Sequence, residues 1–192
     1  MAGTERSSPE TGRAGLEGSD EMIAAELAQG RTEALEELFL RYNKPLYNYL
    51  LRMVGHEDQA EDLVHETFVT LPKKVQTFEG RSKFRTWLYT VATNTARMHL
   101  RKLAVRRELP LNGSPDRPSP ADDPPAAAEK RETIDRVRGA IDKLTETERE
   151  SFLLYWYHKM SYDEIGQVLA INVNTAKVRV HRAHVRLSEI LE

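Results

Sequence analysis

The 192-residue sequence contains no cysteine, which excludes disulfide bonds and thiolate metal sites. No apolar run approaches the ~20 residues that a membrane-spanning helix needs. The N-terminus lacks the basic-then-apolar pattern of a secretory signal. We therefore expect no membrane insertion and a cytoplasmic location. The sequence also lacks β-type alternation of any length, so we expect an all-α fold.

Motifs for catalysis are missing as well. The sequence has no Gly-rich phosphate loop and no nucleophile motif. Its six histidines are scattered, and only His181 and His184 share a helical face. That face is basic, and Lys177 and Arg182 would repel a metal cation. We predict no metal site, no cofactor and no enzymatic activity.

Composition divides the chain into four parts. Residues 1–19 are polar and rich in Gly, Ser and Glu, which predicts a disordered segment. Residues 108–130 hold six of the nine prolines and little apolar matter, which predicts a linker. Helical periodicity fills residues 20–107 and 131–192. The chain is thus expected to form two small helical domains joined by a Pro-rich linker, the C-terminal one a helix-turn-helix.

The apolar spacing of the first domain predicts helices over about 20–27, 32–53, 58–71 and 83–103. Asp20 is the expected cap of the first helix. Pro45 is expected to bend or split the second helix near Asn43, and Gly55 to end it. Pro72 is expected to end the third.

In the second domain, helices are predicted over about 129–142, 146–157, 161–169 and 174–190. Thr145 with Glu148, and Ser161 with Glu164, have the spacing of capping boxes. The residues expected to face the core are Ile134, Val137, Ile141, Leu144, Phe152, Leu153, Trp156, Ile165, Val168, Leu169, Ala176, Val180, Ala183 and Leu187.

Charge is sorted along the first domain. Residues 81–107 contain eight Lys or Arg and no acid, with Phe84, Trp87 and Tyr89 among them. Cations and flat rings suit opened nucleic acid. A solvated charged helix with Trp87 in the core is the alternative. Residues 55–72 contain five acids and no Lys or Arg, which fits a protein-docking face or simply a soluble surface.

The segment 161–190 has the spacing of a helix-turn-helix. Its second helix should carry polar and basic residues outward, and residues 165–187 contain no acid. This pattern favours reading of the DNA major groove. An ordinary helical hairpin with a basic face is the alternative. The predicted outward positions are Thr175, Lys177, Val178, His181 and Arg182, flanked by Arg179 and Arg186.

Three motifs carry a family resemblance. They are DQAEDLVHETF at 58–68, FRTWLYTVATN at 84–94, and SYDEIG at 161–166 leading to NTAKVRVHRA at 174–183. In order and spacing the chain resembles a bacterial extracytoplasmic-function (ECF) sigma factor, of the sigma-70 family, with regions 2 and 4 only. The resemblance implies a promoter-specific transcription initiation factor that binds core RNA polymerase (the β′ clamp and β subunits) and promoter DNA. It also implies an anti-sigma factor as a partner.

The resemblance assigns roles to individual residues. Those implied to bind core polymerase are Asp58, Glu61, Asp62, Leu63, His65 and Glu66. Those implied to contact the −10 element are Phe78, Arg81, Ser82, Lys83, Trp87, Asn94, Arg97 and Arg101. Those implied to contact the −35 element are Ser161, Tyr162, Thr175, Lys177, Val178, Arg179, His181 and Arg182.

The chain departs from the family pattern at His65, Pro72, Asn174 and His181, which bears on promoter specificity. A stand-alone helix-turn-helix regulator that binds duplex DNA without polymerase is the alternative function. A third reading is an adaptor protein whose charge is incidental.

Overall fold

The computed structural model describes residues 18–108, 136–137 and 139–192. Within these ranges the secondary structure is helical, and no strand occurs. The predicted disorder of residues 1–17 and nearly all of the predicted linker lie outside the described residues, as does Ile134.

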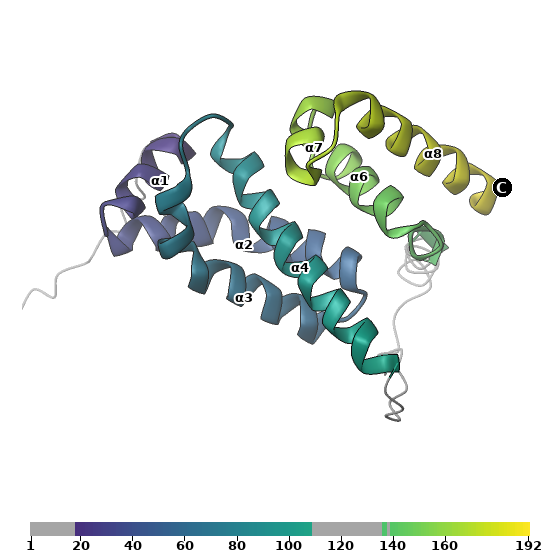
Figure 1. Ribbon diagram of the computed structural model, residues 1–192, viewed down its shortest axis with the longest axis horizontal. Coiled ribbons are helices and arrows are strands. Elements are labelled where there is room, and N and C mark those ends of the chain that lie inside the picture. The colour runs from purple at the N-terminus through teal and green to yellow at the C-terminus, as the bar shows by residue number, and fades with distance from the viewer. Residues whose placement is uncertain (1–17, 109–135, 138) are drawn as a thin grey trace, which may run out of the picture.

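The first domain consists of four helices and one short 3₁₀ turn. In chain order they are α1 (Asp20–Ala28), α2 (Thr32–Val54), α3 (Glu57–Lys74), η1 (Val75–Thr77) and α4 (Phe84–Glu108). Helices α2 and α3 pack side by side, and α4 crosses both (Figure 1). Gly55 ends α2 in the left-handed conformation (φ 78°), as expected of a glycine cap.

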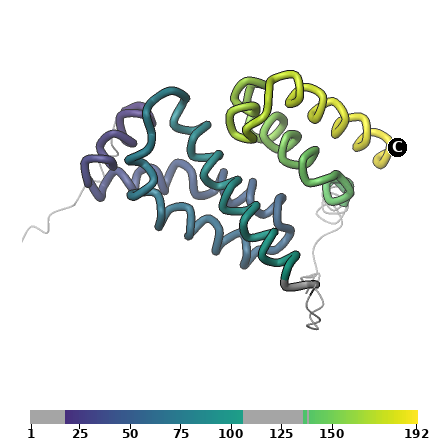
Figure 2. The backbone as a smooth tube through the Cα atoms, in the orientation of Figure 1, coloured from purple at the N-terminus to yellow at the C-terminus, as the bar shows by residue number. Residues whose placement is uncertain are grey.

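The second domain contains α6 (Glu146–Trp156), α7 (Tyr162–Leu169) and α8 (Val173–Leu191). Residues 139–142, just before α6, are also helical. Both predicted capping boxes are present, at Thr145 with Glu148 and at Ser161 with Glu164. The chain path in Figure 2 shows α6 and α7 on the side of the second domain that faces the first, with α8 on the outside; α7 packs on α4, and α6 packs on α2.

Several local expectations are wrong. Pro45 lies inside a continuous α2, and Pro72 lies inside α3, which runs on to Lys74. Ser19, and not Asp20, is the N-cap of α1, since its side chain accepts from the Met22 N–H. Trp156 is 41% exposed instead of facing the core.

Packing explains why the two prolines are tolerated. A proline removes one intrahelical hydrogen bond and crowds the preceding turn, at about 3 kcal/mol. On α2, Tyr42, Leu46 and Tyr49 are buried on both sides of Pro45. On α3 and η1, Leu71 and Val75 are buried on both sides of Pro72. Each buried side chain contributes about 1.5–3 kcal/mol, so continuing the helix is favourable.

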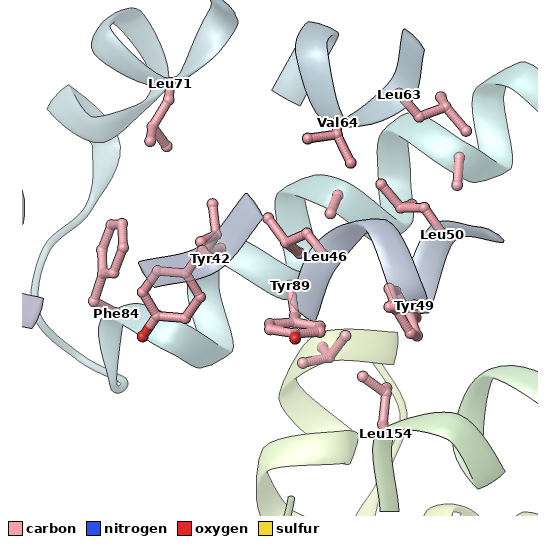
Figure 3. Packing of buried hydrophobic residues seen from close by; sticks show 14 of the residues in the cluster. Tyr42, Leu46, Tyr49, Leu50, Leu63, Val64, Leu71, Phe84, Tyr89 and Leu154 are labelled. Carbon is pink, nitrogen blue, oxygen red and sulfur yellow. The ribbon is translucent and has the colours of Figure 1, made fainter. Parts of the chain in front are cut away.

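One buried cluster runs through both domains. Tyr49 and Tyr89 of the first domain belong to the same core as Leu153 and Leu154 of α6. Figure 3 shows the two tyrosines lying on the side of the first domain that faces Leu154. All four residues are at most 1% exposed. The two domains therefore share a dry interface in this conformation.

Candidate nucleic-acid and protein interfaces

Helix α8 presents a basic face to solvent. The Asn172 side chain caps its first turn by accepting from the Thr175 N–H at 2.7 Å. Every fourth residue or so packs inward, and the residues so buried are Ala176, Val180, Ala183 and Leu187. Among the predicted −35 residues on α8, Lys177, Val178, His181 and Arg182 are exposed, while Thr175 and Arg179 are half-buried.

The helix-turn-helix turn is held by backbone contacts. Ala170 takes the left-handed conformation (φ 54°), and the Ile171 N–H donates to the Gly166 carbonyl at 2.9 Å. The Ile171 side chain then packs against the core. The turn thereby fixes the angle at which α8 leaves α7.

A groove of about 720 Å³ runs beside α8. The N-termini of α6 and α8 both border it, and helix N-termini favour anions such as phosphate. Although partial burial opposes ionisation, hydrogen bonds from Thr145 and the nearby Arg186 hold the pKa of Glu148 below its usual value. The lining residues are Thr145, Thr147, Glu148, Asn172, Asn174, Thr175, Val178, Arg179 and Arg182. Sequence reasoning missed the α6 end of this groove.

Two residues predicted for the −35 element are already engaged. The Ser161 hydroxyl accepts from the Glu164 N–H at 3.2 Å as the cap of α7. The Tyr162 ring is stacked on Tyr155, with centroids 5.0 Å apart. The Lys177 ammonium lies 5.9 Å from the Tyr162 ring centroid.

The residues predicted for the −10 element divide into two groups. Phe78 and Trp87 form an aromatic cluster with the buried Phe84 at the start of α4, with centroids 5.5–5.7 Å apart. Asn94 and Arg101 lie further along α4 and are exposed. Trp87, Asn94 and Arg101 follow one another at intervals of seven residues, so all three lie on one side of the helix.

Cations near the start of α4 have acidic partners. Arg81 is 82% exposed and pairs with Glu79. The Lys83 ammonium lies 2.9 Å from Glu164 of α7. Ser82 is half-buried, and its hydroxyl donates to the Lys83 carbonyl at 3.3 Å.

Arg97 is largely enclosed, with its side chain 22% exposed. Its Nε and Nη2 donate to the two carboxylate oxygens of Glu150 on α6, both at 2.7 Å. Glu150 is 1% exposed. Sequence reasoning missed Glu150, because an acidic side chain is normally assigned to the surface.

A second missed residue sets the start of α4. Glu21 of α1 accepts from the Phe84 backbone N–H at 3.0 Å. This hydrogen bond is the main cause that holds the pKa of Glu21 below its usual value. The neighbouring Asp20 is fixed by Arg41 at 2.9 Å and by the Tyr42 hydroxyl. Helix α1 thus anchors the loop that precedes α4, through a contact 63 residues apart in sequence.

The acidic face of α3 is open to solvent. Its exposed members are Asp58, Glu61, Asp62, His65 and Glu66. Leu63, which was predicted to contact core polymerase, is 1% exposed and belongs to the domain core. Its spacing on the helix places it opposite the acids, so it supports the face from beneath.

Two of the exposed apolar side chains of the first domain lie on α2 and α3, and one of them borders the acidic face. Val69 is 61% exposed and follows Asp62, His65 and Glu66 on the same helical stripe. Leu40 of α2 is 58% exposed, and sequence periodicity did not single it out.

The structure offers no metal or membrane site in the part it describes. Among those residues, no group of three or more His, Asp or Glu side chains could hold a metal ion. No helix there is long and apolar enough to cross a bilayer.

Comparison with known proteins defines the class. The family model for sigma-70 region 2 matches residues 38–106, and that for sigma-70 region 4 matches residues 134–187. The chain therefore belongs to the sigma-70 family of RNA polymerase sigma factors, in its ECF group. Members of this family are transcription initiation factors, and the chain is a sigma factor that directs RNA polymerase to promoters.

Curated relatives agree along almost the whole chain. RNA polymerase sigma factor CarQ of Myxococcus xanthus is 30% identical over 165 residues, which are 84% of this chain and 91% of CarQ. ECF sigma factor SigW of Bacillus subtilis is 28% identical over 182 residues, covering 86% and 93% of the two chains.

Solved structures share the fold. CnrH in complex with the cytosolic domain of CnrY aligns with a TM-score of 0.69 and 26% identity, over 90% of this chain and 96% of that one. Sigma factor RpoE of Bartonella quintana, solved with the anti-sigma factor NepR, aligns with a TM-score of 0.65 and 23% identity over 81% and 95%.

Proposed function

We propose that three separate surfaces divide the work of this sigma factor. The acidic face of α3 docks on the β′ clamp of core polymerase. The loop at 78–83 and the basic side of α4 contact the opened −10 element. The outer face of α8, with the groove beside it, reads the −35 element.

One observation carries this division, namely that exposed charge of opposite sign lies on different helices. Helix α3 exposes Asp58, Glu61, Asp62 and Glu66 with no Lys or Arg before Lys73. Helix α8 exposes Lys177 and Arg182. A carboxylate face repels DNA phosphates, and a cation face attracts them. The two helices therefore suit different partners.

Within the −35 surface, we assign the major groove to Lys177, Val178, His181 and Arg182. Arg182 is the candidate for a bidentate contact to a base edge, the commonest specific contact of this kind. Half-buried Arg179 of α8 lines the groove together with the N-terminus of α6, so we assign it to the DNA backbone. Ser161 and Tyr162 sit at the start of α7, where the first helix of the motif crosses the backbone.

The activity is not catalytic, since polymerase performs the chemistry, and we place the protein in the cytoplasm with that enzyme. We further propose an anti-sigma factor as an inhibitory partner. CnrH, which is 26% identical to this chain, was solved with the cytosolic domain of CnrY bound.

The docking role is tested by charge reversal. Glu61→Lys with Asp62→Lys should abolish pull-down of core polymerase, because both side chains are exposed and face the proposed clamp. Glu189→Lys with Glu192→Lys at the far end of α8 changes the net charge equally and should leave the pull-down intact. Undiminished association of the Glu61/Asp62 variant would exclude this face.

The overall role is tested by transcription in vitro. Core polymerase with the purified protein should start RNA synthesis at discrete sites on fragmented genomic DNA, which sequencing of RNA 5′ ends will map. Core polymerase alone is the control. If adding the protein produced no new start site on any fragment, the proposed function would be wrong.

A further inference from the structure

The loop at 78–83, which joins η1 to α4, is held at both ends by helix α1. Just before the loop, the Gln76 side-chain amide donates to the Ala28 carbonyl at 2.7 Å. At its far end, the Glu21 carboxylate accepts from the Phe84 backbone N–H at 3.0 Å. Figure 1 shows the loop beside α1, between η1 and the start of α4. One short helix thus binds two points of the chain that flank the loop.

Helix α1 sets the distance between these two points. Glu21 and Ala28 are seven residues apart, or about 10 Å along a helix that rises ~1.5 Å per residue. The segment from Gln76 to Phe84 could extend to ~26–29 Å if nothing held it. The two contacts with α1 therefore keep the loop far shorter than its full length and exclude most of its possible conformations.

The start of α4 depends on α1 for its cap. The first turn of α4 contains no acidic residue. Lys83 occupies the capping position, since its carbonyl accepts from the Trp87 N–H at 3.2 Å, but a lysine side chain offers no acceptor. The Ser82 hydroxyl donates to the Lys83 carbonyl instead of accepting from the helix. Glu21 therefore supplies, from another helix, the acceptor that an N-cap side chain normally supplies.

Helix α1 is itself fixed on α2. The Arg41 Nη1 donates to the Asp20 carboxylate at 2.9 Å, and the Tyr42 hydroxyl donates to the other oxygen of the same carboxylate. The Tyr42 ring in turn meets the Phe84 ring edge to face, with centroids 6.1 Å apart. The Glu21 carboxylate is thus presented to α4 by a helix whose first turn α2 holds in place.

We propose that Glu21 and Gln76 are positioning residues for the opened −10 strand, because they hold the loop at 78–83 in the conformation that binds it. This role rests on the function proposed above for the loop. A loop that is ordered before binding loses little conformational freedom when the strand binds. A loop released from α1 would be competent for only part of the time, and its apparent affinity would fall by that fraction.

Release of the loop should weaken sequence reading more than DNA binding in general. Exposed cations of α4 such as Arg101 attract phosphates of any sequence. The −35 surface lies on α8, in the other domain. The loss should therefore fall on the preference for the correct opened strand, and affinity for the −35 duplex should stay. A variant that merely unfolded would lose affinity for every DNA together.

The first measurement is hydrogen exchange in the free full-length protein, read by mass spectrometry of peptides that cover residues 76–84. Glu21→Ala should speed exchange there by about fivefold or more, because the Phe84 N–H loses its acceptor. Glu21→Gln keeps an acceptor and should show a smaller change. Glu33→Ala removes an exposed acid from the first turn of α2 and should leave exchange in this segment unchanged. Unchanged exchange in both Glu21→Ala and Gln76→Ala would show that α1 does not hold the loop.

The second measurement is binding of polymerase with each variant to a fluorescent promoter fragment whose −10 region is held open by mismatches. The promoter is one mapped from RNA 5′ ends as described above. A copy with a scrambled opened strand and a duplex with the −35 element alone complete the set. Glu21→Ala and Gln76→Ala should each lower the preference for the correct strand by about threefold to fivefold, and together by more. Affinity for the −35 duplex should stay within about twofold of the wild type, and Glu21→Gln should restore most of the preference.

The outcomes separate a failure of the positioning role from a failure of the function itself. Faster exchange with an unchanged strand preference would overturn the positioning role. Equal losses on all three DNAs would overturn it as well, since they would indicate a loss of folded protein. A wild type that yielded no mapped promoter, or that bound the correct and scrambled strands equally, would instead refute the assignment of the loop to the −10 element, and the role of α1 with it.

Discussion

The turn of the helix-turn-helix permits a quantitative prediction at Gly166. A Cβ added there would lie 2.8 Å from the Ile171 carbonyl oxygen, a backbone atom that cannot rotate away. The Ile171 N–H also donates to the Gly166 carbonyl at 2.9 Å, so moving one backbone strains the other. Gly166→Ala should therefore push α8 away from α7.

A matched control isolates the size of this effect. Gly139 is helical and exposed, and a Cβ there meets nothing within 4 Å. Both substitutions gain about 1 kcal/mol of helix propensity. Only Gly166→Ala incurs the overpacking cost, about 1–3 kcal/mol. The difference between the two variants is thus about 1–3 kcal/mol, or ~2–12 °C in melting temperature for a chain of this size.

The assay reads unfolding through a single tryptophan in the second domain. The sequence has two tryptophans, so a Trp87→Phe background leaves Trp156 as the only one. Trp156 stacks on His184 of α8 with centroids 6.0 Å apart, and its emission should report separation of α6 from α8. Thermal unfolding is then compared between the two alanine variants. If Gly166→Ala melted as high as Gly139→Ala, the close approach of the turn would be refuted.

Three further predictions concern other parts of the molecule. Glu21→Ala should lower the free energy of unfolding of the first domain by about 0.5–2 kcal/mol, read by Trp87 fluorescence, because it removes the acceptor for the Phe84 backbone N–H. Glu21→Gln keeps an acceptor and should lose less stability, and equal losses would exclude the cap. Arg182→Ala should weaken −35 duplex binding by ~1–3 kcal/mol and relax specificity at one base, while equal loss on scrambled DNA would indicate a phosphate contact. Burial and the nearby Arg85 lower the pKa of His158 to about 4, so the folded protein holds the neutral ring, and its free energy of unfolding should fall by up to ~2 kcal/mol as the pH is lowered from ~6.5 toward 5. His158→Gln should flatten that pH dependence of the unfolding free energy, measured by urea unfolding at each pH, and an unchanged dependence would refute it.

Local signals in the sequence were the most reliable predictors. A capping box is complete within four residues, so Thr145 with Glu148 predicted the start of α6 without knowledge of the rest. Gly55 ended α2 for a similarly local reason, its left-handed conformation. Prolines misled the prediction because their effect depends on whether neighbouring turns are buried, as they are around Pro45 and Pro72.

Contacts between distant segments could not be predicted from pattern. Glu150 occurs in a polar stretch at the start of α6, where an acid normally faces water, yet it is buried against Arg97, 53 residues away. Trp156 was predicted to be buried because it is apolar. The aromatic side chains of α6 extend beyond its buried face, and Trp156 remains 41% exposed. Both errors concern which side of α6 meets another helix, and a single helical periodicity cannot distinguish two buried sides.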